Sequence, residues 1–155
     1  MINELLKNPE KYKIKDFRAT NEVYLAEIEG QKYVIKSPSW YSDIAYSYYL
    51  QYNKLLWDMQ KFASSKTRFL NEVKKLIKLK EYGCSVPWLI AYDGKTITAI
   101  LEYMGEENCR DVLKNTSANF TDELRLIENA FISLNEIHKS NTIHGDPVIK
   151  NANRV

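Results

Sequence analysis

Three places in the sequence carry side chains that could do chemistry: Lys36, Glu72 and the segment 144–151, which contains Asp146 and Asn151. The chemistry open to an ammonium group and carboxylates is electrostatic, because such groups can neutralise a charge or move a proton. Lys36 ends a predicted strand on the same face as Val34, so its ammonium group would be partly removed from water. On its own, Lys36 could also be a lysine whose stem covers apolar surface while its charge reaches solvent.

Glu72 raises the question of a partner. It has apolar neighbours three, four and seven positions away on a predicted helix, and burying an unpaired carboxylate there would be costly. The local partner is Lys75, one turn further on, at about 0.2–0.5 kcal/mol. The other candidate is Lys36, reached across the sheet. Taken alone, the spacing of Glu72 favours the local pair.

The segment 144–151 reads His-Gly-Asp-Pro-Val-Ile-Lys-Asn and directly follows a long predicted helix that ends near Ile137-His138. A surface loop is the simplest interpretation of such a composition. The feature that distinguishes this segment is the spacing of an acid and an amide, Asp146 and Asn151, five residues apart.

The elements that must position these residues begin with strands. After a short helix at Asn3–Lys7, the chain from Tyr12 to Lys36 predicts strands with a tight turn at Glu29-Gly30. Apolar residues alternate onto both faces of this hairpin, so we expect both faces to be covered. Val23 and Leu25 share one face, and the other carries Tyr24, Ala26 and Ile28.

Two helices are expected next. The tyrosine-rich stretch 40–65 has helical spacing of its apolar residues and predicts an amphipathic helical insert. A second helix is predicted from about Lys66 to Tyr82, and it should stop at Gly83, because glycine readily takes the left-handed conformation that ends a helix.

The remaining elements are a hairpin and a helix. The runs Val86–Tyr92 and Lys95–Tyr103 flank Asp93-Gly94, a strong hairpin signal. Thr121 is expected to cap a helix that extends to about Lys139. A short polar helix or turn is predicted at 106–115 and an irregular tail at 141–155. Because strands and helices do not alternate, the predicted class is α+β with an antiparallel sheet.

Composition excludes several classes. The chain has 155 residues, with 22 basic and 20 acidic side chains and a formal charge of +2, which argues against a strongly cationic nucleic-acid-binding protein. No run approaches the roughly 18 apolar residues that a transmembrane helix needs. Cys84 and Cys109 make neither a disulfide framework nor a metal quartet, so we expect a reducing cytoplasm.

Taken together and in order, these segments resemble the protein-kinase-like superfamily. Tyr33-Val34-Ile35-Lys36 is similar to its Val-Ala-Ile-Lys strand, and Asn71-Glu72-Val73 to the helix that supplies the glutamate partner. Ile100-Leu101-Glu102-Tyr103-Met104 is similar to the linker between the two lobes. Ile143-His144-Gly145-Asp146 with Asn151 resembles the catalytic loop.

The resemblance implies roles for these residues with ATP and Mg²⁺. Lys36 would neutralise the α- and β-phosphates of ATP and Glu72 would hold it in place. Asp146 would take the proton of the acceptor hydroxyl, Asn151 would bind magnesium, and His144 would brace the loop.

The nucleotide site of the resemblance continues around these residues. The backbone of Glu102, Tyr103 and Met104 would hold adenine, and Leu101 would limit the depth of the pocket. Thr20 and Asn21 would lie near the phosphates, although the stretch 17–21 carries no glycine. Backbone amides therefore approach a phosphate less closely there.

Several features indicate the branch of the superfamily. Glycine in the His-Gly-Asp motif, and Val148 in place of a lysine, are typical of kinases that act on substrates other than proteins. Thr20–Tyr24 resembles the choline kinase group, and Gly83–Pro87 resembles a segment of lipopolysaccharide kinases and of the Bud32 and RIO branch. With the insert 40–65, the resemblance favours a lipopolysaccharide (Kdo/heptose) kinase that phosphorylates a sugar or small-molecule hydroxyl.

The resemblance also implies a domain division and an incomplete fold. Residues 1–104 would form the small lobe, and 105–155 the start of the helical lobe, with a helix at 121–139 and the catalytic loop at 142–153. The second metal-binding aspartate of the family is not found after Asn151. We therefore expect either part of a longer kinase or an inactive, pseudokinase-like module that binds a protein partner or itself through the exposed helix 121–139. Binding of nucleic acid through the basic helix around Arg68 is the weakest alternative, since the net charge is close to zero.

Overall fold

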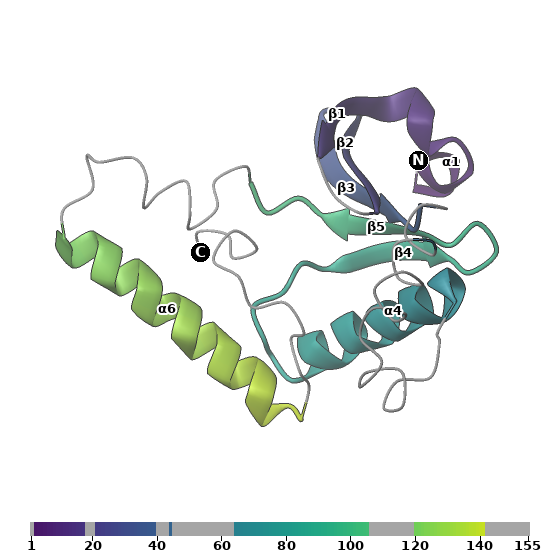
Figure 1. Cartoon of the computed structure of the whole chain (residues 1–155). Coiled ribbons are helices and arrows are strands. Elements are labelled where there is room, and N and C mark those ends of the chain that lie inside the picture. The colour runs from purple at the N-terminus through teal and green to yellow at the C-terminus, as the bar shows by residue number, and fades with distance from the viewer. Residues whose placement is uncertain (1, 18–20, 40–43, 45–63, 106–119, 142–155) are drawn as a thin grey trace. The chain divides into compact units, whose positions relative to one another are not determined.

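The computed structural model describes residues 2–17, 21–39, 44, 64–105 and 120–141. The predicted insert 40–65 lies almost entirely outside these residues, and the predicted segments 106–115 and 142–153 lie wholly outside them. The elements of the described part, in chain order (Figure 1), are α1 (Ile2–Lys7), the 3-10 helix η1 (Pro9–Tyr12), β1 (Lys13–Phe17), β2 (Glu22–Ile28), β3 (Gln31–Ser37), α4 (Ser65–Glu81), β4 (Leu89–Asp93), β5 (Thr98–Glu102) and α6 (Phe120–Lys139).

The five strands form one antiparallel sheet in the order β1-β2-β3-β5-β4, which confirms the predicted α+β class. The turn between β2 and β3 has the two residues that the sequence predicted. Glu29 and Gly30 both have positive φ angles, 53° and 77°, as the tight two-residue turn between twisted strands requires. The sheet and both its flanking helices belong largely to one compact unit, residues 1–77 and 87–103; the second unit comprises 78–86 and 104–155.

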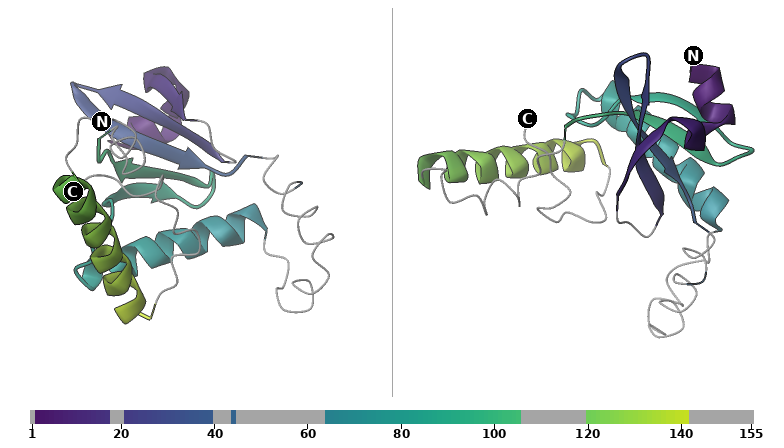
Figure 2. Two further views of the ribbon diagram at one scale, coloured as in Figure 1. Left: turned by 60° about the vertical axis from the view of Figure 1, so that its left-hand side comes forward. Right: turned by 90° about the horizontal axis from the view of Figure 1, so that it is seen from above.

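Each face of the sheet is covered by a helix (Figure 2). On one face the side chain of Leu5 from α1 is fully buried in a cluster with Tyr24, Ala26 and Ile35. On the other face Phe69 and Val73 of α4 form a buried cluster with the strand residue Ala99. Both the alternation of faces along β2 and the cover on each side are as predicted.

The second hairpin differs from its prediction. Its turn contains four residues, 94–97, rather than Asp93-Gly94 alone, because Asp93 pairs directly with Thr98. The carboxylate of Asp93 accepts hydrogen bonds from the backbone N–H of Lys95 (2.8 Å) and the hydroxyl of Thr96 (3.0 Å). The Asp93 side chain thus satisfies polar groups inside a longer loop. Strands β4 and β5 both begin later than the sequence predicted.

Helix α4 ends as predicted, with Gly83 in a left-handed conformation (φ 78°). The N–H of Gly83 donates to the carbonyl of Lys80 (2.9 Å), and that of Cys84 donates to Leu79 (3.0 Å). This pair of bonds is the Schellman arrangement, which satisfies carbonyl groups that the last turn would leave without partners.

Helix α6 begins at Phe120, so Thr121 lies inside the first turn and is not the cap that the sequence predicted. Near the other end, Ile137 and Ser140 are buried. Phe120 and Phe131 are 72% and 68% exposed, so the apolar stripe of α6 is only partly covered. In the ranges that the structure describes, no helix combines the length and the hydropathy needed to cross a membrane.

Candidate functional site

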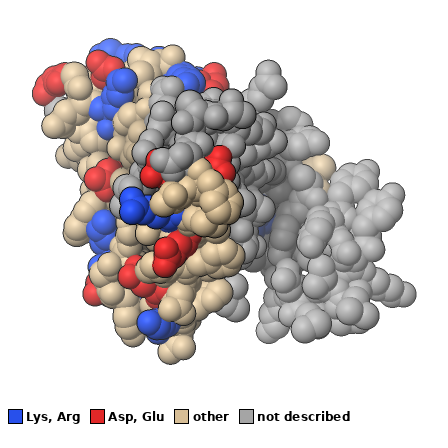
Figure 3. Space-filling view, turned by 90° about the vertical axis from the view of Figure 1, so that its left-hand side faces the viewer, with Lys and Arg blue, Asp and Glu red and all other residues tan. Residues whose placement is uncertain are grey.

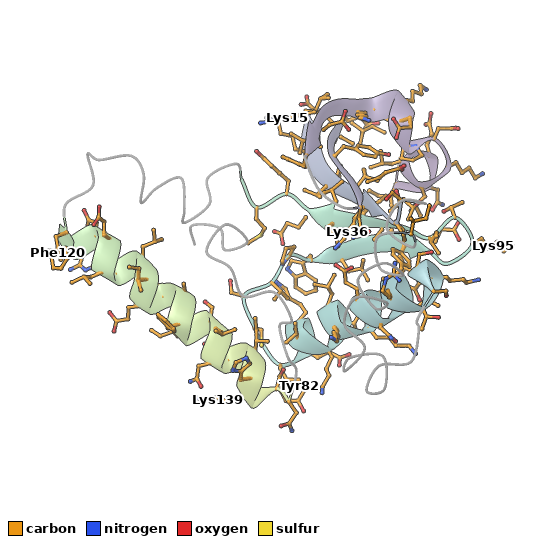
Figure 4. The ribbon with its side chains drawn as sticks, viewed as in Figure 1. Lys15, Lys36, Tyr82, Lys95, Phe120 and Lys139 are labelled. Carbon is orange, nitrogen blue, oxygen red and sulfur yellow. The ribbon has the colours of Figure 1, made fainter. Side chains whose placement is uncertain are left out.

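An ion pair joins strand β3 to helix α4. Lys36 pairs with Ala99 of β5 across the sheet, which places it on the face that α4 covers. Its Nζ donates a hydrogen bond to Oε1 of Glu72. The two side chains are 25% and 43% exposed, so the pair is partly desolvated and still reached by water. The labelled Lys36 lies between the strands and α4 in Figure 4.

This pair answers the question that the sequence left open. The carboxylate of Glu72 accepts a hydrogen bond from Lys36, the partner 36 positions away across the sheet. The buried residues Phe69 and Val73 anchor α4 against the sheet on either side of Glu72. Packing of the helix therefore fixes the position of the carboxylate, and pairing of β3 with β5 fixes the backbone of Lys36.

A small cavity of about 40 Å³ lies beside the ion pair. The site prediction included three of its residues, Asn21, Lys36 and Glu72. It did not include Arg68, which lies four positions before Glu72 and so on the same face of α4. This four-residue spacing from Glu72 was the sequence signal that could have identified Arg68 as a site residue. The full lining is Asn21, Lys36, Pro38, Ser65, Arg68, Phe69 and Glu72.

The end of β5, where the predicted linker begins, is held by a side chain. Oε2 of Glu102 accepts a hydrogen bond from the N–H of Trp88 (3.0 Å), while the N–H of Glu102 donates to the carbonyl of Trp88 (2.9 Å). Leu101 is buried and pairs with Val34, so it lies on the same sheet face as Lys36. These contacts fix the backbone at the end of β5.

The other predicted site residues fall into two groups. Tyr103 is described, and Lys32 Nζ lies 5.8 Å from the centre of its ring; Met104 follows it outside any helix or strand. Thr20, His144, Asp146 and Asn151 lie outside the described residues. Within the described ranges, no group of three or more His, Cys, Asp or Glu side chains could hold a metal ion. The predicted magnesium ligand Asn151 lies outside these ranges, so its role stays a prediction.

A second cavity, of about 390 Å³, lies beside β1 and β2. Lys13, a basic residue of its lining, is already in ion pairs, because Lys13 Nζ lies 2.7 Å from Asp16 and 3.5 Å from Glu10. Burial, and next the charge of Glu10, raise the pKa of the Tyr24 hydroxyl well above its usual value. These mutually satisfied groups stabilise the start of the sheet.

The described surface carries both signs of charge. On the face shown in Figure 3, lysines and arginines alternate with aspartates and glutamates over the described residues, and no single basic patch covers that part. On this face, the described residues do not form the continuous cationic surface typical of a nucleic-acid-binding protein.

A similarity to a known protein bears on this site. No protein-family model matches the chain. The chain is 24% identical over 86 residues to the KEOPS complex subunit Bud32 of Pyrococcus abyssi. The match covers 56% of this chain and 38% of that protein, so the chain corresponds to well under half the length of this relative. Together with the five-stranded antiparallel sheet, the similarity supports the kinase-like superfamily, and it does not single out the lipopolysaccharide-kinase branch.

Proposed function

We propose that this chain forms the nucleotide-binding part of an ATP-dependent phosphotransferase. The observation that carries the proposal is the Lys36–Glu72 ion pair between β3 and α4. Phosphoryl transfer requires positioning and charge neutralisation more than covalent chemistry by the protein. A lysine held by a carboxylate on a packed helix meets that requirement. Its ammonium group is held in one position and is still accessible to solvent.

The other roles follow from the same fold. Lys36 would contact the α- and β-phosphates of ATP, and Leu101 with Val34 would offer apolar surface to adenine on the same sheet face. The backbone of Glu102, whose position the Trp88 contacts fix, would hydrogen-bond the base. In this proposal residues 1–104 form the small lobe, and residues 105–155 begin a helical lobe.

The catalytic loop of the proposal lies in the second part of the chain. Asp146 would accept the proton of the acceptor hydroxyl, and His144 would brace the loop. Asn151 would bind Mg²⁺, whose charge would offset that of the phosphates. The acceptor would be a hydroxyl of a small molecule or of a lipopolysaccharide sugar, as the His-Gly-Asp sequence and Val148 suggest. The similarity to Bud32 supports the kinase-like activity and leaves the acceptor to experiment.

Nucleotide-dependent thermal stabilisation tests this proposal on the whole chain. We expect Mg²⁺ with ATP or ADP to raise the melting temperature, and Lys36→Ala to abolish the increase. Lys75→Ala, which removes an exposed lysine from α4, the helix that carries Glu72, is the matched control and should respond as the unaltered chain does. Absence of stabilisation by any nucleotide would refute the proposed function.

The exposed side chains of α6 favour a second candidate, an inactive kinase-like module that binds a protein partner or a second copy of itself. Phe120, Leu124 and Phe131 are 72%, 49% and 68% exposed, and together they give this helix an uncovered apolar stripe. Bud32 is named as a subunit of a complex, which agrees with such a role. A monomer by light scattering that binds no apolar dye would exclude this candidate.

A further inference from the structure

Arg68 lines the cavity beside the Lys36–Glu72 pair, and neither the sequence motifs nor the proposed roles give it a function. It lies one helical turn before Glu72, so both side chains project from the same face of α4. The cavity-lining residues thus carry two cations, Lys36 and Arg68, and one carboxylate, Glu72. Two basic groups against one acidic group give the lining a net positive formal charge, which favours an anion over a cation.

Asn21 is a second polar residue of the cavity that could contact a phosphate. Asn21 lines the same cavity and immediately precedes β2, at the end of the stretch 17–21 that carries no glycine. A loop without glycine brings its backbone amides less closely to a phosphate. A chain that binds polyphosphate with such a loop needs other hydrogen-bond donors. In this cavity the lining residues Asn21 and Arg68 offer a side-chain amide and a guanidinium group.

Arginine is suited to this task. Its planar guanidinium group presents paired N–H donors that match two oxygens of a phosphate, while lysine acts as a single point of charge. The neighbouring residue Phe69 is buried against the sheet, which positions the backbone of Arg68 on α4. The cavity thus combines the paired donors of Arg68 with the ammonium group of Lys36, which Glu72 holds.

We infer that Arg68 is a phosphate ligand of the nucleotide site and, with Lys36, recognises the polyphosphate chain in place of a glycine-rich loop. This inference rests on the proposed function and deepens it. It assigns selectivity for di- and triphosphates over monophosphates to a residue on α4. Asn21 assists by donating its side-chain amide to a phosphate oxygen.

Calorimetric titration of the whole chain with ATP, AMP and inorganic pyrophosphate, each with Mg²⁺, tests the inference. Arg68→Gln should weaken ATP and pyrophosphate binding about tenfold or more, the value of one charge-assisted contact, and should lower the ratio of ATP to AMP affinity. Arg68→Lys should give an intermediate loss, because it keeps the charge and loses the fork. Lys74→Gln, an exposed lysine of α4 that does not line the cavity, should change each affinity less than twofold.

The possible failures are distinguishable. If the unaltered chain binds ATP and Arg68→Gln binds it equally well, the role of Arg68 is wrong and the proposed function stands. If the unaltered chain binds no nucleotide, both are wrong. If a folded Arg68→Gln variant loses ATP and AMP affinity in the same proportion, Arg68 does not recognise the polyphosphate chain and the inference is overturned. Arg68→Lys provides a second test if Arg68→Gln does not fold.

Discussion

The strength of the Lys36–Glu72 pair can be measured by a double-mutant cycle on stability. Lys36→Met keeps most of the aliphatic stem and removes the charge, and Glu72→Gln keeps the shape of the carboxylate. The free energies of unfolding of both single variants, the double variant and the unaltered chain give the coupling between the two side chains.

The expected magnitude follows from the exposure of the pair. Two unit charges about 4 Å apart near a protein surface attract by about 4 kcal/mol before any cost is counted. Here the side chains are 25% and 43% exposed, so water screens the attraction, and ordering two flexible side chains costs entropy. We therefore expect a net coupling of about 1 kcal/mol at low salt. In roughly 1 M salt, where the screening length falls to about 3 Å, the coupling should decrease markedly.

Urea unfolding followed by circular dichroism supplies the free energies, and equal slopes among the four proteins would show that the unfolded states are comparable. A second cycle with Lys75→Met in place of Lys36→Met is the control for the local helix pair. A coupling of zero for Lys36 at low salt, or a larger coupling for Lys75, would refute the geometry described above. A coupling above about 3 kcal/mol would refute the screening argument, since that range belongs to fully buried pairs.

Three further predictions concern the scaffold. Leu5→Ala should lower the free energy of unfolding in urea by about 2–5 kcal/mol, because Leu5 is fully buried; Leu6→Ala, at a partly buried neighbour, should cost less. Gly83→Ala should lower the same free energy by about 1 kcal/mol, because the φ angle of 78° strains alanine while no atom obstructs its Cβ; Gly83→Asn should cost less than Gly83→Ala, and equal losses would contradict this reasoning. Burial raises the pKa of the Tyr24 hydroxyl, so the unfolded chain loses that proton first, and stability should fall as pH rises above about 10, a dependence that Tyr24→Phe should reduce.

Much of the sheet could be predicted because its signals are local. Alternation along β2 placed Tyr24 and Ala26 on one face and Leu25 on the other, since successive side chains of a strand point to opposite sides. Glu29-Gly30 and Gly83 were predicted correctly because each glycine takes a positive φ angle that other residues rarely adopt.

The errors came from competition between local signals. Asp-Gly is typical of two-residue turns, but the carboxylate of Asp93 instead binds groups within a longer loop. Thr121 is a good helix cap, yet α6 begins one residue earlier. The cavity beside Arg68 could not be predicted from local pattern at all, because it exists only once β3 has packed beneath α4.

The order of the strands also has a consequence for how the chain folds. Strands β2 and β3 are joined by a two-residue turn, whereas the pairing of β3 with β5 must wait until the whole crossover from Ser37 to Thr98 has closed. Each doubling of a closed loop adds about 0.6 kcal/mol of entropic cost, and non-local pairing slows folding. The β1-β2-β3 meander can therefore form early, and the β3–β5 ladder that brings Lys36 opposite Ala99 should form late. The long crossover should therefore slow the formation of the β3–β5 pairing, which is the pairing that positions Lys36 for its ion pair with Glu72.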